Sequence, residues 1–321
     1  MQPEEFTLVR DLLRTFATQH AVGSADDVKP QCRAAAQEAL DGLGLAELRG
    51  TARPAATVQE CSLLAEEHGR LPLTTSLLGT VLLAPELLRL LRADQHDARF
   101  TVALASDLRL PGPDAQDLRA WDCDGADAAL YADTEGTVTR ARLGPPAPTA
   151  DLLRSVRQAS AVGEPLGRLA PEDRQRWQAY ALVVVASELV GAAGSLVEQS
   201  VAYARERRQY GRRIGSFQAV QHLLADATVL VEAGTSATRY AAWCLDHEPP
   251  DRALTAARTA KAEVNTSALE AVYAGMQVFG GIAQTWEHIA HLYLRKVLVG
   301  ATVLATTADL LPALAVPEAT R

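Results

Sequence analysis

Two histidines, a glutamate and a tryptophan crowd into the segment GGIAQTWEHIAHLYLRK, residues 280–296. Imidazole and carboxylate groups at this density can bind a metal ion or transfer protons. A zinc site of the HExxH type needs two histidines four residues apart, with the glutamate between them. Here the order is Glu287, His288, His291, and the sequence offers no evident third ligand. We therefore expect no metal site, and ring nitrogens satisfied by hydrogen bonds are the ordinary alternative.

A glycine pair, Gly280 and Gly281, opens the same segment. Glycine commonly follows the last turn of a helix, where it relieves backbone strain. It also lets a flat or charged ligand touch the backbone, because it has no side chain. The residues alone leave both functions open.

The second chemically dense segment is YARERRQYGRRIGSFQAVQHLLAD, residues 203–226. Guanidinium groups together with the free N–H groups at a helix N-terminus can hold a pyrophosphate. Cations at a helix C-terminus also simply complement the helix dipole. Five arginines fall where one predicted helix ends and the next begins, at Arg205, Arg207, Arg208, Arg212 and Arg213.

The rest of the chain predicts mainly α structure to position these segments. Of 321 residues, 48% are hydrophobic and 5% aromatic, which favours packed helices. We expect an N-terminal helical domain (1–95), an abbreviated small β domain with a connector (96–170) and a C-terminal antiparallel four-helix bundle (171–321). Gly191 and Gly194 would let helices approach closely. Apolar periodicity and breaker residues predict helices at 5–20, 171–206, 215–247, 251–279 and 284–312.

Charge and cysteine content exclude several classes of protein. The formal net charge of −8 disfavours a nucleic-acid binder or a membrane-surface protein. The N-terminus has no apolar signal core, and the longest apolar run is interrupted by Glu188. The cysteines form no CxxC pair and indicate reduced thiols in a cytoplasmic protein. They are Cys32, Cys61, Cys123 and Cys244.

In combination and order, these segments resemble the acyl-CoA dehydrogenase superfamily. ERRQYG followed by SFQAVQHLLAD is similar to the family's ER, aromatic-Gly, FQ and LAD pattern, and YAGMQVFGG is similar to its Gln-x-x-Gly-Gly element. TWEHIAHLYLRK and the N-terminal AEEHGRLPL agree with it too. The resemblance spans nearly the whole chain and is most specific in its last 120 or so residues. It implies an FAD cofactor, an acyl-CoA substrate and subunit pairing.

The resemblance also assigns roles to individual residues. It implies that Arg207, Gln209 and Tyr210 contact the FAD of a neighbouring subunit and that Gln218 lies near it. Gln277 and the Gly280–Gly281 pair would contact FAD from the turn after their helix. Arg208, Arg212 and Arg213 would be solvated support, and Glu287 a structural residue and not a base.

The reaction that the resemblance implies needs a carboxylate base for the α proton of the thioester. One family location for this glutamate falls near Leu304 and the other near Ala181, and neither position holds a glutamate. Glu188 is a weak candidate about two turns beyond Ala181, and Glu263 is another. No catalytic residue is therefore assigned.

The β region lacks the longer flavin-ring loop of the family, and only Ala105–Asp107 is similar to it. The chain thus resembles the short subunits of heteromeric acyl-CoA dehydrogenases in steroid-degrading actinobacteria, which contain two copies each of two chains. This implies a second family subunit that supplies the base, an electron-transfer flavoprotein as acceptor, and a bulky, steroid-derived acyl-CoA. The alternatives are a self-sufficient dehydrogenase, a superfamily flavin monooxygenase and a flavin-free helical interaction subunit.

Overall fold

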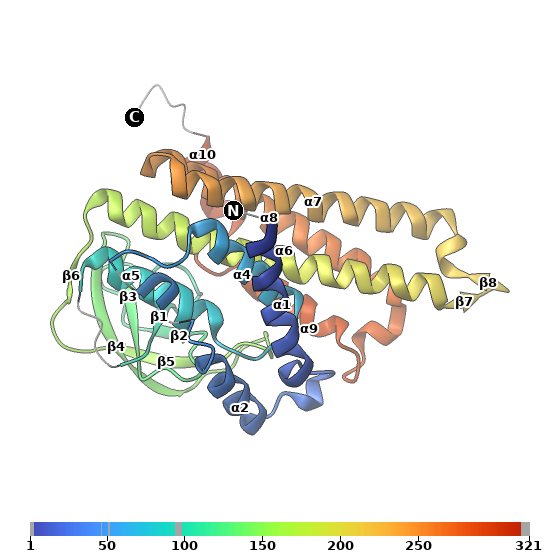
Figure 1. Ribbon diagram of the computed structural model, residues 1–321, viewed down its shortest axis with the longest axis horizontal. Coiled ribbons are helices and arrows are strands. Elements are labelled where there is room, and N and C mark those ends of the chain that lie inside the picture. Colours follow the sequence, from blue (N-terminus) through green and yellow to red (C-terminus); the bar gives the residue numbers. More distant parts are fainter. Residues whose placement is uncertain (1–2, 46, 51, 94–97, 316–321) are drawn as a thin grey trace.

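The structure is a computed structural model that describes residues 3–45, 47–50, 52–93 and 98–315. Along the chain, N-terminal helices are followed by a small sheet and then by three long helices (Figure 1). The predicted helix–β–helix order is therefore confirmed. The N-terminal elements are α1 (Pro3–His20), η1 (Ala25–Asp27), α2 (Pro30–Asp41), α3 (Glu47–Gly50), α4 (Val58–Arg70), the π-helical η2 (Leu77–Leu83) and α5 (Ala84–Leu91).

Strands β1 to β5 close into a small barrel. The sheet order is β3-β1-β2-β5-β4-β6, and an additional β3–β4 pairing joins the ends of the five-stranded part. β1 and β3 pair in parallel, and the other neighbours are antiparallel. The strands are β1 (Phe100–Ala105), β2 (Leu118–Trp121), β3 (Ala128–Ala132), β4 (Thr137–Pro146), β5 (Val156–Ala161) and β6 (Gly167–Arg168).

Side chains alternate between the two faces of this barrel. Ala103 and Ala129 point into a separate inner cluster, while Val102, Leu104 and Leu130 join the large core shared with the helices. Alanines suit the inside because a barrel of few strands is narrow. Three β-prone stretches of the predicted β domain form β1, β3 and β4: RFTVALAS (99–106), DAALYAD (127–133) and TVTRARL (137–143). β2 and β5 were not expected from the sequence, because charged or polar residues interrupt their apolar pattern.

Three long helices form the body of the C-terminal part. They are α6 (Pro171–Glu206), α7 (Gln218–His247) and α8 (Pro250–Phe279), close to their predicted limits, and they lie side by side in Figure 1. Pro171 and Pro250 stand in the first turn of their helices, where a missing N–H breaks no hydrogen bond. α6 is long and apolar enough to cross a membrane, but 94% of its apolar window is buried inside the protein. Its composition is that of the central helix of the bundle.

α4 and α6 cross in direct backbone contact at two glycines. A Cβ atom at Gly69 would lie 2.0 Å from the carbonyl oxygen of Glu188, and one at Gly191 would lie 1.9 Å from that of Glu66. The close approach expected at Gly191 is therefore confirmed. Gly194 instead faces the side chains of Arg70 and Val231.

The single helix predicted over residues 284–312 is wrong. The structure has η4 (Gly280–Gln284), α9 (Ala290–Gly300) and α10 (Thr307–Leu314) instead. Leu304, between α9 and α10, has a φ of +69°, which no helix accommodates. Thr306 then starts α10 with a capping box, in which its hydroxyl accepts from the Asp309 N–H. This break places Leu304 against the barrel and not in the bundle.

Candidate functional site

The arginine-rich segment forms a hairpin at one end of the bundle. Strand β7 (Arg208–Gln209) pairs with β8 (Arg212–Arg213) directly after α6 ends. Tyr210 and Gly211 at its tip have φ values of +51° and +79°. Positive φ at both central residues is what a tight two-residue hairpin turn requires. Tyr210 therefore holds a conformation unusual for a bulky residue while its side chain is 93% exposed.

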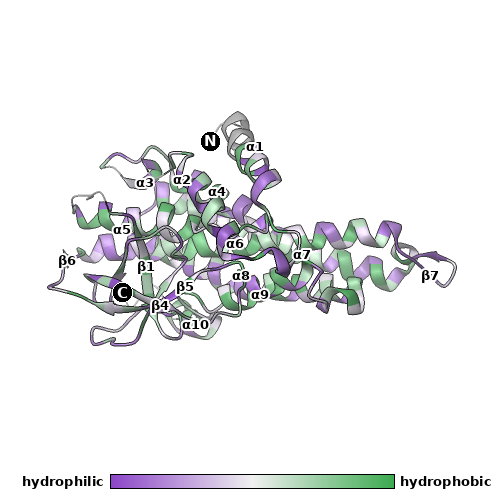
Figure 2. Ribbon diagram, turned by 90° about the horizontal axis from the view of Figure 1, so that it is seen from below, coloured by the Kyte–Doolittle hydropathy of each residue, from purple (hydrophilic) through white to green (hydrophobic). Residues whose placement is uncertain are grey.

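The hairpin carries a concentrated positive charge. Arg208 and Arg213 face each other across the two strands, and the residues of the hairpin are exposed. In the part of the chain that the structure describes, neither they nor Arg207 form an ion pair. Figure 2 shows hydrophilic residues gathered at this end. Like charges directly opposite each other on strands destabilise the pairing, so the hairpin is suited to an anionic partner.

The glycine pair ends α8 at the same end of the bundle. Gly280 has a φ of +69°, and a Cβ atom at Gly280 or Gly281 would meet no other atom within 4 Å. The ring of Phe279, at the end of α8, lies 4.9 Å from that of Tyr203 near the end of α6. Val278 belongs to one small core with Ala204 and Leu224, next to the hairpin. Two segments about 70 residues apart thus share one exposed surface.

We call this exposed surface the distal end: the hairpin, the start of α7 and the glycine-pair turn. Every residue for which the sequence predicted an FAD contact lies on it and is exposed in the single chain. Those residues are Arg207, Gln209, Tyr210, Gln218, Gln277, Gly280 and Gly281. Their proximity is a finding of the structure, while their contact with FAD stays a prediction.

The histidine-containing stretch that follows makes structural contacts. The Trp286 Nε1–H donates to Asp26 at 2.8 Å, and its ring stacks on His291 with centroids 5.6 Å apart. His288 Nδ1 accepts from the Ala290 N–H, and its ring lies edge-on to Phe279. Burial lowers the pKa of His288, which favours a neutral ring. Among the described residues, no group of three or more His, Cys, Asp or Glu side chains could hold a metal ion.

Glu188 lies in a buried ionic network and not in an open site. Its Oε1 accepts from His68 Nδ1 at 2.9 Å and from Lys296 Nζ at 3.4 Å, while Oε2 accepts from Arg154. Arg154 also donates to Asp122 at 2.6 Å. Burial acts to raise the pKa of Glu188, but the cations and His68 outweigh it and hold that pKa well below its usual value. A carboxylate held this firmly in its charged form is a weak base, so these contacts favour a structural role.

The two positions at which the family base was expected do meet in space. Ala181 and Leu304 both line a cavity of about 180 Å³ at the other end of the bundle, beside the barrel. We call this cavity the slot. Pockets that hold drug-sized ligands have volumes of roughly 300–1,000 Å³, so the slot is smaller than that. Its walls are mainly apolar, with Leu110, Trp177, Leu182 and Leu254 among them.

The acids near the slot do not suit a catalytic base. Asp309 lines its edge, but it accepts from Thr306 and from Arg109, and these hydrogen bonds lower its pKa. Glu263 lies on the exposed side of α8 and does not line the slot. The described lining therefore contains no glutamate.

Backbone pairing joins the wall of the slot at Leu304 to the loop after β1. The Leu304 N–H donates to the Leu108 carbonyl oxygen at 2.8 Å. Both leucines have positive φ, +69° and +66°. Residues with a side chain rarely adopt this backbone conformation, which persists only where the surrounding structure enforces it. The Arg109 Nε–Asp309 ion pair at 2.8 Å holds the same two segments together.

A buried lysine on α8 binds backbone carbonyl groups next to the slot. Lys261 on α8 is fully buried and donates to Asn265 and to the Gly300 carbonyl oxygen at the end of α9. No carboxylate accompanies it among its described hydrogen-bond partners. Burial accordingly lowers its pKa to about 7.

Comparison with known proteins places this architecture in a family. The C-terminal domain of acyl-CoA dehydrogenases matches residues 180–304. The acyl-CoA dehydrogenase IpdE2 of Mycobacterium tuberculosis is 30% identical over 319 residues, covering 96% of each chain. FadE34 of the same organism is 39% identical over 123 residues, 38% of this chain and 17% of that protein. The chain belongs to the acyl-CoA dehydrogenase family, which is a family of oxidoreductases.

Solved structures show the same fold. A chain of the ChsE4–ChsE5 complex from Mycobacterium tuberculosis has a TM-score of 0.78 at 19% identity, covering 99% of this chain and 99% of that one. A variant of the Tcur3481–Tcur3483 steroid acyl-CoA dehydrogenase has a TM-score of 0.76 at 23% identity, covering 97% of this chain and 96% of that one. PigA, solved with FAD and proline, has a TM-score of 0.78 at 15% identity, covering 98% of this chain and 97% of that one.

Proposed function

We propose that this chain is the half-site subunit of a heteromeric, FAD-dependent acyl-CoA dehydrogenase. The observation that carries the proposal is the slot: both locations of the family base line it, and neither holds a glutamate. The chain would contribute FAD contacts across an interface, and a second family subunit would supply the catalytic base. This arrangement would be a heterotetramer.

The distal end suits half of an FAD site. Arg207 would pair with the pyrophosphate, since a guanidinium group binds phosphate oxygens through charged hydrogen bonds. The bare backbone at Gly281 has room for a ligand. When bound, FAD would accept the β hydrogen of the substrate as hydride. Exposure of the whole surface in the single chain agrees with a site completed by another subunit.

The identity of the substrate and partners rests on relatives. One structural neighbour is a steroid acyl-CoA dehydrogenase and another is a two-protein complex. We propose a bulky, steroid-derived acyl-CoA as the substrate and an electron-transfer flavoprotein as the electron acceptor. The cytoplasm, where the thiols of this chain would stay reduced, is its proposed location.

The first test is a visible absorption spectrum of the purified chain. It is recorded alone and after co-expression with a full-length family member encoded beside it. We expect flavin bands in the co-purified assembly and none in the single chain. Stoichiometric flavin in the chain alone would contradict the half-site proposal, because it would require complete sites.

A pair of variants tests the role of the distal end. Arg207→Ala in the assembly should lower flavin retention by about tenfold or more, the effect of losing one charged phosphate contact. Arg142→Ala, an exposed arginine on β4, is the matched control and should leave flavin content unchanged. A fully flavinated Arg207→Ala assembly would remove Arg207 from the proposed site.

A further inference from the structure

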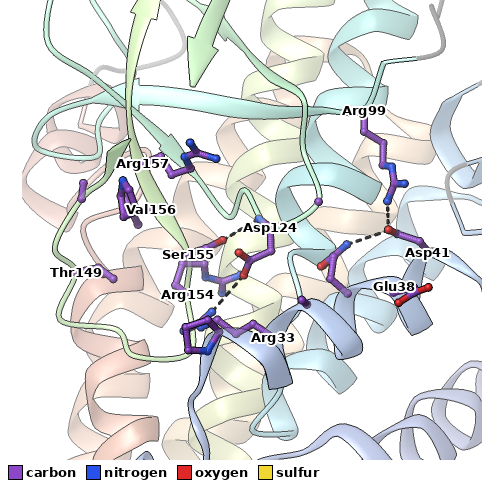
Figure 3. A pocket seen from close by; sticks show the side chains of 16 residues that line it. Arg33, Glu38, Asp41, Arg99, Asp124, Thr149, Arg154, Ser155, Val156 and Arg157 are labelled. Atoms are coloured by element: carbon purple, nitrogen blue, oxygen red, sulfur yellow. Dashed lines mark hydrogen bonds and ion pairs between the residues drawn. The ribbon is translucent and has the colours of Figure 1, made fainter. Parts of the chain in front are cut away.

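A second, larger cavity lies between α2 and the barrel. Its volume is about 770 Å³, within the range of roughly 300–1,000 Å³ typical of small-molecule sites. Helix α2 forms one wall, and the end of β4 with the start of β5 forms the other (Figure 3). We call it the α2 pocket. None of the residues predicted to contact FAD lines it.

Four arginines line the α2 pocket, and three of them have carboxylate partners. Arg33 pairs with Asp124 at 3.3 Å, and Arg99 pairs with Asp41. Arg154 is committed to the buried network that contains Glu188. These pairs hold the walls of the pocket together and leave little positive charge for a ligand.

Arg157 is the exception. Its Nε–H donates to the Gly144 carbonyl oxygen at 2.7 Å, which fixes the direction of the side chain. Within the described ranges it forms no ion pair with a carboxylate. In Figure 3 it lies on the same wall as Thr149 and Val156, across the pocket from α2. A half-buried guanidinium whose outer nitrogens lack an anion favours binding a carboxylate in a bidentate manner.

The remaining lining gives the ligand its other properties. Pro30, Pro146, Ala147 and Val156 supply apolar surface, which would bury a hydrocarbon body. Glu38 on α2 is exposed at the edge of the pocket. Together with the acids already paired in the walls, it would repel a dianion such as a phosphate ester. The lining therefore selects a monoanion with an apolar body.

We propose that the α2 pocket binds a small apolar carboxylate, with the carboxylate on Arg157 and the apolar part against Val156 and the proline-rich wall. The proposal does not depend on the flavin function. It concerns residues far from the distal end, so flavin content and binding to this pocket can be measured separately.

The probe is 2-naphthoate, titrated into the folded chain by isothermal calorimetry, with 2-naphthalenemethanol as its uncharged counterpart. We expect the carboxylate to bind about tenfold or more tightly than the alcohol, the fold-change that one charged hydrogen-bonded pair contributes. Arg157→Gln should remove this preference. Arg142 is an exposed residue of β4, and Arg142→Gln is the charge control that should keep the preference for the carboxylate.

A second variant pair tests the location without touching a charge. Ala34 and Ala35 are adjacent exposed residues of α2, and only Ala34 lines the pocket. Ala34→Trp should fill the cavity and abolish naphthoate binding. Ala35→Trp should keep the dissociation constant of naphthoate within about twofold of the parent value. Absence of naphthoate binding to the parent chain would overturn the proposal. The proposal would also be overturned if Arg157→Gln and Ala34→Trp bound naphthoate as tightly as the parent chain. It would be overturned as well if the controls Arg142→Gln and Ala35→Trp lost binding to the same extent as the test variants.

Discussion

The two ends of the helical bundle differ in what they leave open. At the distal end, the hairpin arginines and the glycine pair are exposed, and the backbone at Gly281 has empty space beside it. At the other end, the slot is small and mainly apolar, and its described lining contains no glutamate. A dehydrogenase that works alone needs a substrate cavity with a base at one end and flavin contacts at the other. This chain has the residues predicted to contact FAD at one end and no glutamate at the two expected base positions at the other.

The contrast extends to electrostatics. Among the described residues, the hairpin arginines form no ion pair, while the charges of the Glu188 network near the barrel are buried and paired. Unpaired exposed cations cost little stability and are available to a ligand. Buried paired ions are needed for the fold, because removing one leaves the other uncompensated. Substitutions at the two ends should therefore separate stability from flavin retention.

The largest effect is expected for Glu188→Gln. Loss of its charge leaves Arg154 and Lys296 buried with fewer counterions, which should lower the free energy of unfolding by about 3–5 kcal/mol. Urea denaturation measures this, with Glu198→Gln as the control. Glu198 pairs with Arg70 but is 67% exposed, so its loss should cost about 1 kcal/mol or less. An unchanged stability together with lost dehydrogenase activity in the assembly would make Glu188 the base after all.

The next largest effect compares one substitution at the α4–α6 crossing and at the distal end. Gly191→Ala places a methyl group 1.9 Å from the Glu66 carbonyl oxygen and should destabilise the chain by about 1–3 kcal/mol or more. Gly281→Ala meets no atom within 4 Å and should change stability by about 0.5 kcal/mol or less. In the assembly, however, Gly281→Ala should weaken flavin retention. Thermal melts and flavin absorbance give both results, and a flavin-neutral Gly281→Ala would argue against this turn as a ligand contact.

Lys261 gives the region behind the slot a dependence on pH. Its pKa is about 7 in the folded chain against an ordinary value of 10.5, so between these values the unfolded chain binds a proton that the folded chain does not. Stability should rise with pH from about 7 toward 10, by up to about 1.4 kcal/mol per unit. Lys261→Met should flatten this rise and Lys29→Met, on the surface, should preserve it. The same slope in both variants would show that another group causes it.

The smallest effect is expected for Arg109→Gln. The Arg109–Asp309 pair is exposed and links the loop after β1 to α10, so its loss should leave the melting temperature nearly unchanged. The Leu304 amide, which donates to Leu108, should nevertheless exchange its hydrogen faster. Hydrogen exchange followed by mass spectrometry checks this, with Arg142→Gln as the control. An unchanged exchange rate would mean that the Leu304–Leu108 hydrogen bond is held without the ion pair.

Sequence reasoning predicted well where the signal is local. The limits of α6 follow from apolar periodicity, and the break after it follows from the breaker residues in GRRIG, residues 211–215. The closeness of Gly191 to α4 followed from a glycine inside a buried helix. Grouping of the hairpin with the glycine pair came from family resemblance, and the structure shows the packing of Tyr203 on Phe279 that produces it.

What sequence reasoning missed depends on distant partners. The break at Leu304 is enforced by Leu108, about 200 residues earlier, so no local pattern shows it. The role of Glu188 depends on His68, Arg154 and Lys296, each from a different part of the chain. Arg157 was not singled out because a lone arginine in a polar strand carries no motif. A net −8 chain with so few lysines could have prompted the question of why Lys261 and Lys296 stand in apolar helices.

The Glu188 network has a consequence for how the chain is made on the ribosome. Lys296 follows Glu188 by 108 residues, which at roughly 5–20 residues per second takes on the order of 5–20 seconds to synthesise. Until α9 emerges, Glu188 on α6 lacks its partner Lys296, so its charge is only partly neutralised. The apolar surface of α6 that packs against α9 is also exposed during this time. The nascent chain should therefore need a chaperone during this interval. Prematurely terminated products that end before residue 296 should be degraded and not accumulate.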